Sequence, residues 1–264
     1  MKDILLVDFS WLFVRLFYVN NTNREHIQGT IRYISMLANI FDKAYVILDG
    51  KNGSVKKKEL LSTYKEGRTD KEEIYCNFKE TIETLVTKDN IVICRNNDRE
   101  ADEVIAAIAT KFNRTHRITI FSGDKDMLQL AYLPNITIAN ALKGGKVVKV
   151  TRDEILDKFK ISKLEDVLKL RVFKGDASDK IKPPIPRFMK KHIDNVISLW
   201  VTNDLNENIF NYIIDNIKDE KVKAKLINAK DNIFLNYELM NLNNKAEHAS
   251  ILKNVKRLSK RIDK

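Results

Sequence analysis

The amino-acid sequence predicts an α/β protein, in which a three-layer, mostly parallel sheet is followed by a mainly helical C-terminal region. In the first half of the chain, short apolar runs alternate with helical patterns, which is typical of a parallel sheet covered by helices. After about Pro134 and one further hairpin, only helical patterns follow. We therefore expect an α/β domain over residues 1–150 and a helical region over residues 151–264.

Each strand of the first domain is predicted from a short apolar run, and each helix from apolar residues at 3.6-residue spacing. The four expected strands cover residues 4–7, 44–48, 91–94 and 118–121. The helices between them cover residues 10–18, 30–41, 71–86 and 100–112. A further strand at 136–139 and a turn at Gly144 and Gly145, leading into 147–150, complete the predicted sheet.

The C-terminal region begins with two clear helical patterns. Residues 151–159 start with Thr151 and Glu154 in capping-box spacing, and residues 163–173 follow. A proline-rich break at 183–186 precedes further helical patterns, and residues 253–264 are predicted to form a basic tail.

The composition is that of a globular protein. The chain has 264 residues, an apolar share of 44% and a net charge of +11, which exclude disorder as the main interpretation. With neither a membrane-length apolar stretch nor a signal-peptide pattern, we expect a soluble, cytoplasmic protein. Cys76 and Cys94 lack metal-ligand spacing, so a disulfide framework or a zinc site has little support. The positive charge favours a polyanionic partner, most often nucleic acid, although such a bias serves solubility as often.

The segment 51–71 is too long for an ordinary connection between a strand and a helix. It holds seven basic residues against three acidic ones. We expect a functional loop here, and the alternative is a merely solvated charged loop.

Acidic residues come after each of the first four predicted strands. Because ligands of parallel sheets bind at the carboxyl ends of the strands, these residues are expected to converge. They are Asp8, Asp49, Glu100, Asp102, Glu103, Asp124 and Asp126, and a spaced pair, Asp176 and Asp179, lies where two predicted helices meet.

Any one of these acids is most simply a helix cap. Together they would repel each other and raise each other's pKa values unless a cation neutralised them. Oxygen ligands suit Mg²⁺, so the cluster predicts two-metal phosphodiester hydrolysis. The four histidines, which lack ligand spacing, are interpreted as surface or structural residues; they are His26, His116, His192 and His248.

An ordered set of short motifs runs from Asp8 to Asp179. It comprises Asp8-Phe9-Ser10 with Arg15, Leu48-Asp49, Tyr64-Lys65-Glu66-Gly67-Arg68, Glu100-Ala101-Asp102-Glu103-Val104-Ile105, Gly123-Asp124-Lys125-Asp126-Met127-Leu128-Gln129-Leu130 and Gly175-Asp176-Ala177-Ser178-Asp179. The set resembles the 5′ nuclease, or flap endonuclease, family. That family includes the N-terminal domain of bacterial DNA polymerase I and, closest in pattern, stand-alone bacteriophage 5′ exonucleases and the phage ribonuclease H.

The resemblance implies a PIN-like fold and a stand-alone, Mg²⁺-dependent 5′→3′ exonuclease or flap endonuclease. Its substrates would be phosphodiester bonds at 5′ flaps, nicks or ends of DNA and RNA–DNA hybrids, during primer or flap removal in replication and repair. Mn²⁺ is expected to substitute for Mg²⁺. The chain is expected to be a monomer without a membrane partner, and recruitment by a replication clamp or a single-strand-binding protein is open.

The resemblance also implies residue roles. Asp8, Asp49, Glu100, Asp102 and Asp124 match ligands of the first metal, and Asp126, Asp176 and Asp179 match those of the second. Glu103 stands where the family has an Asp and is counted among the metal ligands. Arg15, Lys65 and Arg68 match catalytic positions near the scissile phosphate.

The segment 51–71 corresponds to the family's arch for a single-stranded 5′ end. Lys56, Lys57, Lys58 and Tyr64 are expected to bind nucleic acid there. Tyr64 would either stack on a base or pack, buried, under the loop.

Beyond Asp179 the family pattern fails. A glycine-rich hairpin between two helices is replaced by a segment with three prolines, so the helix-hairpin-helix is degenerate and its backbone amides are lost. We expect exposed cations to bind duplex phosphates instead; these are Lys180, Lys182, Arg187, Lys190 and Lys191.

Two other functions remain open. One is a catalytically decayed nucleic-acid-binding accessory protein of the same fold, favoured by Glu103 and the altered hairpin. The other is a small-molecule phosphohydrolase. The sequence leaves open the choice between exonuclease and endonuclease action and between RNA and DNA.

Overall fold

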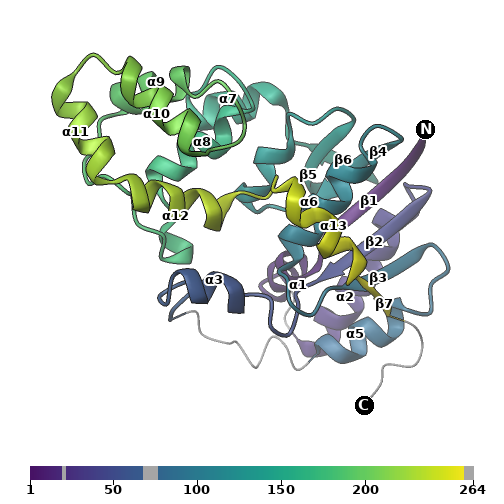
Figure 1. The fold of residues 1–264 in the computed structure, drawn as a ribbon. Coiled ribbons are helices and arrows are strands. Elements are labelled where there is room, and N and C mark those ends of the chain that lie inside the picture. The colour runs from purple at the N-terminus through teal and green to yellow at the C-terminus, as the bar shows by residue number, and fades with distance from the viewer. Residues whose placement is uncertain (20–21, 68–76, 259–264) are drawn as a thin grey trace. The chain divides into compact units, whose positions relative to one another are not determined.

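The computed structural model describes residues 1–19, 22–67 and 77–258 (Figure 1). The chain divides into two compact units. The sheet unit comprises residues 1–56, 69–154 and 242–264, and the helical unit comprises residues 57–68 and 155–241. The sequence prediction placed one boundary at residue 150, whereas in the structure the chain returns to the sheet unit after residue 241.

A seven-stranded sheet forms the centre of the sheet unit, with the strand order β6-β5-β4-β1-β2-β3-β7. The strands are β1 (Lys2–Asp8), β2 (Lys43–Leu48), β3 (Ile91–Arg95), β4 (His116–Phe121), β5 (Ile136–Lys143), β6 (Lys146–Lys149) and β7 (Lys256–Leu258). The pairs β1–β2, β1–β4, β2–β3 and β4–β5 are parallel, and only the outer pairs β5–β6 and β3–β7 of the described strands are antiparallel. The predicted mostly parallel sheet is thus confirmed, and β7 adds a strand inside the predicted basic tail.

The central strand β1 is buried on both faces, as its continuous apolar run predicts. Side chains alternate between the faces, so Leu5 and Val7 enter the core on one side. On the other side Ile4 and Cys94 line a cavity of about 360 Å³. The packing of β1 on both faces fixes its carboxyl end, where Asp8 lies.

Burial raises the pKa of the Cys94 thiol to about 11. The other cysteine, Cys76, lies outside the described residues.

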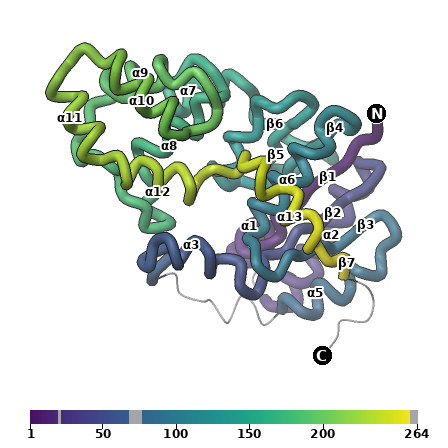
Figure 2. The backbone as a smooth tube through the Cα atoms, in the orientation of Figure 1, coloured from purple at the N-terminus to yellow at the C-terminus, as the bar shows by residue number. Residues whose placement is uncertain are grey.

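Helices cover both faces of the sheet (Figure 2). One face carries α1 (Phe9–Phe17), α2 (Asn23–Ala38) and α5 (Phe78–Leu85), and the other carries α6 (Ala101–Phe112) and α13 (Lys245–Lys253). The helix α2 begins seven residues before its predicted start because Thr22 caps it, accepting from the Glu25 backbone N–H at 3.2 Å. Of the helix predicted over residues 71–86, the part up to residue 76 lies outside the described residues.

The helical unit packs around Trp200, a buried side chain whose Nε1 donates to the Asp204 carbonyl oxygen at 3.0 Å. Its helices are α8 (Asp166–Lys174), η2 (Ala177–Asp179), α9 (Lys190–Leu199), α10 (Glu207–Asn216), α11 (Glu220–Asn228) and α12 (Lys230–Met240). Two further helices, α3 (Val55–Leu60) and α7 (Arg152–Phe159), each have residues in both units. The mainly helical C-terminal region is confirmed, and within the described ranges we find no helix with the length and apolarity needed to cross a membrane.

A glycine fixes the conformation of the loop that follows α8. Gly175 has φ +68°, and a Cβ atom there would lie 2.4 Å from the Ile181 carbonyl oxygen. Gly67, in the same unit, has φ +74°, and within the described residues no heavy atom lies within 4 Å of such a Cβ. We expect Gly67→Ala to lower the free energy of unfolding by about 1 kcal/mol and Gly175→Ala by on the order of 3 kcal/mol. Urea unfolding followed by tryptophan fluorescence measures both values, and equal losses would contradict the packing described.

Candidate metal centre

Three adjacent strands deliver carboxylates to one edge of the sheet. Asp8 ends β1 and pairs in register with Ile47 of β2, Asp49 directly follows β2, and Asp124 follows β4. Asp8 also caps α1, where its Oδ1 accepts from the Trp11 backbone N–H at 3.2 Å. The parallel arrangement therefore produces the convergence that the sequence predicted for these three residues.

Ser122 connects two of these carboxylates. Its hydroxyl donates to Asp8 Oδ2 at 2.7 Å, and its Oγ accepts from the Asp124 backbone N–H at 3.1 Å. The Asp126 backbone N–H in turn donates to Asp124 Oδ1 at 2.9 Å, at the start of η1 (Lys125–Leu130). The sequence analysis missed Ser122, although its place directly after a strand and two residues before Asp124 is a usable signal.

The start of α6 adds three more carboxylates. Glu100 is the N-cap residue, and one oxygen each of Glu100, Asp102 and Glu103 lie within 4.8 Å of one another. The Ala101 backbone N–H donates to Asp49 Oδ1 at 2.8 Å and thereby ties the end of β2 to this helix. The Glu103 backbone N–H donates to Asp102 Oδ1 at 2.7 Å. Seven of the nine predicted ligands thus belong to the sheet unit.

Burial makes Asp8 the electrostatic centre of this group. Its side chain is 7% exposed, and desolvation raises its pKa to about 7 against the lowering effect of the Ser122 hydrogen bond. The negative charges of Asp49 and Asp124 contribute to the same rise. A divalent cation would supply the missing positive charge, and a donor set made only of oxygens fits Mg²⁺ or Mn²⁺. The residues therefore suit the metal that the motifs imply.

Asp176 and Asp179 belong to the helical unit and are held by other side chains. Arg171 donates to Asp176 Oδ2 at 2.8 Å, and the Ser178 backbone N–H donates to Asp176 Oδ1 at 2.8 Å. Burial alone would raise the pKa of Asp176, but the Ser178 and Arg171 hydrogen bonds bring it below its ordinary value. The Tyr64 hydroxyl donates to Asp179 Oδ2 at 3.3 Å. Their assignment to a second metal remains a prediction.

The predicted basic residues have different surroundings. Arg15 is exposed on α1, with its guanidinium carbon 5.1 Å from the Trp11 ring centroid, and it donates to the Asn140 carbonyl oxygen. Lys56 forms an ion pair with Glu247, and Lys58 is exposed. Arg68 lies outside the described residues.

Of the two roles predicted for Tyr64, stacking on a base or packing under the loop, the structure favours packing. Its side chain is 2% exposed and lies in the core of the helical unit, where it cannot stack on a base. The amines of Lys57 and Lys65 lie 5.5 Å and 5.1 Å from its ring centroid. Lys57, predicted to bind nucleic acid, is itself buried beside this ring.

The segment that replaces the glycine-rich hairpin carries all five predicted cations on the surface. They are Lys180, Lys182, Arg187, Lys190 and Lys191, of which Lys190 pairs with Asp194 at 2.6 Å. Asn236 Nδ2 donates to the Lys182 carbonyl oxygen at 2.9 Å and to that of Val172 at 2.9 Å. The buried Asn236 amide thus joins one carbonyl group of this loop, that of Lys182, to a carbonyl group of α8.

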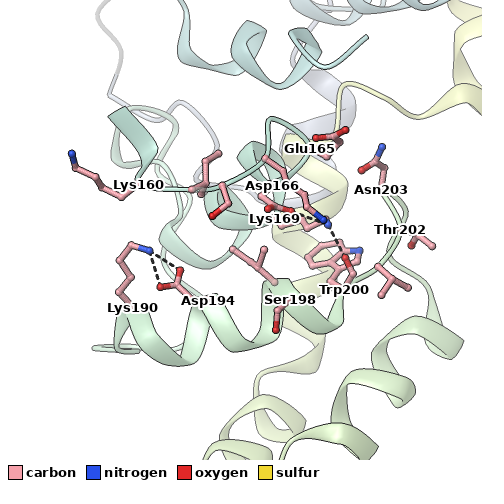
Figure 3. A pocket seen from close by; sticks show the side chains of 15 residues that line it. Lys160, Glu165, Asp166, Lys169, Lys190, Asp194, Ser198, Trp200, Thr202 and Asn203 are labelled. Carbon is pink, nitrogen blue, oxygen red and sulfur yellow. Dashed lines mark hydrogen bonds and ion pairs between the residues drawn. The ribbon is translucent and has the colours of Figure 1, made fainter. Parts of the chain in front are cut away.

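A cavity of about 820 Å³ lies in the helical unit between α8 and α9 (Figure 3). On its wall the buried Lys169 amine donates to Asp166 Oδ1 at 3.0 Å and to the Trp200 carbonyl oxygen at 2.6 Å. These hydrogen bonds join the beginning of α8 to the end of α9. The Lys169 charge is balanced within the protein, so the structure gives this residue a stabilising role.

The histidines also have structural surroundings. The Nε2 atoms of His26 and His248, both buried, lie 2.9 Å from the carbonyl oxygens of Phe13 and Leu242. The His192 ring stacks on Phe188 with centroids 5.6 Å apart, and His116 Nδ1 lies 2.9 Å from Thr115 Oγ1.

Comparison with known proteins identifies one family. Residues 3–160 match the family model described as 5′-3′ exonuclease, N-terminal resolvase-like domain. The chain is 26% identical over 186 residues to a 5′-3′ exonuclease of Mycoplasmopsis pulmonis, covering 69% of this chain and 61% of that protein. It is 25% identical over 262 residues to DNA polymerase I of Lactococcus lactis, covering 93% of this chain and 29% of the polymerase. The chain therefore spans less than two thirds of the length of these relatives.

Solved structures show the same fold. A bacteriophage T5 protein co-crystallised with metal ions matches with a TM-score of 0.73 and 19% identity, over 96% of this chain and 93% of that one. The bacteriophage T5 flap endonuclease, in a pseudo-enzyme-product complex with DNA and metal ions, matches with a TM-score of 0.71 and 19% identity, with the same coverage.

The raised pKa of Asp8 predicts how the stability of the metal-free protein depends on pH. The unfolded carboxyl titrates near 3.8 and the folded one near 7, so the cost of ionisation appears as the pH rises from 3.8 and is complete above 7. At about 1.4 kcal/mol per pKa unit this cost is about 4 kcal/mol. Asp8→Asn, which keeps a capping oxygen, should be equal to wild type in unfolding free energy near pH 4 and more stable above pH 7.

Urea unfolding in chelator across this pH range measures the difference. Asp3→Asn is the matched control with the opposite sign. The hydrogen bond from Arg117 lowers the pKa of Asp3, so its carboxylate contributes stability above the unfolded pKa that the variant would lose. A pH-independent difference for Asp8→Asn would contradict the electrostatic account.

Proposed function

Since this chain belongs to the 5′-3′ exonuclease family, we propose that it is a metal-dependent, structure-specific 5′ nuclease. It hydrolyses phosphodiester bonds at 5′ flaps, nicks or ends of DNA or RNA–DNA hybrids, in primer or flap removal. The observation that carries the proposal is the buried Asp8 carboxylate, whose pKa is raised by burial and by the charges of Asp49 and Asp124. In its ionised form such a site is stabilised when a metal ion neutralises it.

The metal ligands in this proposal are Asp8, Asp49, Glu100, Asp102 and Asp124 for a first ion, and Asp126, Asp176 and Asp179 for a second. A divalent ion held by these carboxylates would supply the Lewis acidity that activates water and stabilises developing charge on the phosphodiester oxygens. Ser122 keeps Asp8 and Asp124 in fixed positions, and Ala101 does the same for Asp49. The residues of the chain therefore hold the ligand oxygens in place before any ion binds.

Nucleic acid is held by cations in this proposal. Arg15, kept in place by Trp11 and the Asn140 carbonyl, contacts the scissile phosphate together with Lys65 and Arg68. Lys56 and Lys58 bind a single-stranded 5′ end, and the exposed cations between residues 180 and 191 bind the duplex. The net charge of +11 and the DNA complex of the bacteriophage T5 relative support a nucleic-acid substrate. A monomer acting in the cytoplasm, with recruitment by a clamp or single-strand-binding protein, completes the proposal.

One observation favours a second candidate function, a nucleic-acid-binding protein without catalysis. Both side-chain oxygens of Glu103 are engaged inside the protein, by Arg99 and by the Glu100 backbone N–H. The carboxylates around Asp8 argue against this function, since binding alone does not require them.

Cleavage of a 5′-labelled flap and of a nicked RNA–DNA hybrid, in Mg²⁺ or in chelator, tests the proposal. We expect Mg²⁺-dependent release of short 5′ products, lowered by at least about a hundredfold in Asp124→Asn because a charge-stabilising group is removed. Asp215→Asn, an exposed acid of α10, is the matched control and should cleave like wild type. Tight binding without cleavage in all three proteins would establish the second function, and product lengths separate exonuclease from endonuclease action.

The salt dependence of duplex binding tests the role of the altered hairpin. In an Asp124→Asn background, replacing Lys182, Arg187 and Lys191 with Gln should weaken binding. The slope of log Kd against log salt should fall by about 0.9 for each DNA phosphate that the protein no longer neutralises. The matched control replaces three exposed lysines of the same unit, Lys218, Lys221 and Lys225. An equal change in both proteins would show that only net charge matters.

A further inference from the structure

We propose that Glu247, on the C-terminal helix α13, is a positioning residue for the metal-binding carboxylates at the start of α6, and that it acts through Arg99 and Glu103. The inference rests on the proposed metal-dependent function and deepens it. It assigns a role in the metal centre to a residue far from the motifs in sequence. It also assigns Glu103 to the support of the ligands instead of to the metal.

Arg99 lies between two carboxylates. Its Nη1 atom donates to Glu103 Oε1 at 2.9 Å and to Glu247 Oε2 at 2.7 Å. The side chains of Arg99, Glu103 and Glu247 are 16%, 14% and 30% exposed, so this interaction is shielded from bulk water more than an ordinary surface pair. Glu247 also pairs with Lys56 through its other oxygen.

Glu103 continues this series of hydrogen bonds into the metal centre. Its Oε2 accepts from the Glu100 backbone N–H at 3.0 Å, which closes the capping box of α6. One oxygen is thus held by Arg99 and the other by the helix cap. Glu103 therefore fixes the first turn of α6, from which Glu100 and Asp102 project.

The segment that carries Glu247 is itself fixed by buried polar side chains. Asn96 Nδ2, just after β3, donates to the Ile251 carbonyl oxygen at 2.9 Å. Gln129 Oε1, in η1, accepts from the Leu242 backbone N–H at 3.0 Å. Both Asn96 and Gln129 are buried. Glu247 is consequently presented to Arg99 from a rigid support, which a flexible surface side chain would not provide.

Charge gives these interactions a measurable consequence. Burial alone would raise the pKa of Glu247, but the hydrogen bond from Lys56 and the charge of Arg99 hold it below its ordinary value, so Glu247 is ionised. Its negative charge balances the positive charge of Arg99, which lies next to the carboxylates at the start of α6. Removing the Glu247 charge leaves Arg99 to repel an incoming divalent cation. Removing Arg99 has the opposite effect, because it eliminates that repulsion while Glu103 Oε2 still accepts from the Glu100 backbone N–H in the capping box.

Binding of Mn²⁺ to the metal-free protein, measured at pH 8 by electron paramagnetic resonance of the free ion and without DNA, tests the proposal. We expect Glu247→Gln to weaken Mn²⁺ binding roughly tenfold, as is common for residues that support metal ligands, and Glu247→Lys to weaken it further. Arg99→Gln should tighten binding, and Glu247→Gln should have no further effect in that background. Glu207→Gln, which breaks the exposed pair with Lys230, is the matched control and should bind like wild type.

Glu247→Gln and Arg99→Gln are expected to change Mn²⁺ affinity in opposite directions. The two variants therefore distinguish a positioning role from a loss of structure. If Arg99→Gln and Glu247→Gln both weakened Mn²⁺ binding, or if neither changed it, the proposal would be overturned, and circular dichroism establishes that each variant is folded. If the wild type cleaves DNA but the variants bind Mn²⁺ as tightly as the wild type does, this inference is overturned and the nuclease function stands. A wild type that binds no Mn²⁺ would overturn both.

Discussion

The burial of one carboxylate, Asp8, beside other carboxylates at the edge of the sheet is the constraint on which the rest of the site depends. Asp8 is buried because it ends the central strand, and neighbouring parallel strands place Asp49 and Asp124 beside it. The protein fixes the oxygens of these acids with the Ser122 hydroxyl and with backbone N–H groups, which hold the carboxylates together without cancelling their charge. The resulting arrangement is costly alone and suited to a divalent ion, which links the fold to its chemistry.

The protein treats its other acids differently. Asp176 is balanced by the buried Arg171, and Asp166 by the buried Lys169, so each of these carboxylates has a partner within the helical unit. At the start of α6, Arg99 balances Glu103 and is in turn balanced by Glu247. These paired acids differ from Asp8, whose buried carboxylate has the acids Asp49 and Asp124 as its charged neighbours.

Local patterns in the sequence were sufficient for the fold class and for the convergence of Asp8, Asp49 and Asp124. Apolar runs locate the parallel strands, and the carboxyl ends of such strands meet by topology. Features that depend on distant segments were missed. Strand β7 is three residues long and lies in a basic stretch, and the pairing of Arg99 with Glu247 joins residues 148 positions apart. For Tyr64 the sequence left two alternatives, base stacking and burial under the loop, and tertiary packing shows that it is buried.

The return of residues 242–258 to the sheet has a consequence for synthesis on the ribosome. The sheet unit is discontinuous, and most of the helical unit, residues 155–241, is made between residues 154 and 242. At a translation rate of roughly 5–20 residues per second, α13 and β7 emerge on the order of ten seconds after β6. The central strands are therefore made well before α13 and β7 can pack against the sheet. During this interval the edge of β3 and the face beneath α13 are exposed. The nascent chain therefore acquires its complete sheet only when the helical unit has already left the exit tunnel.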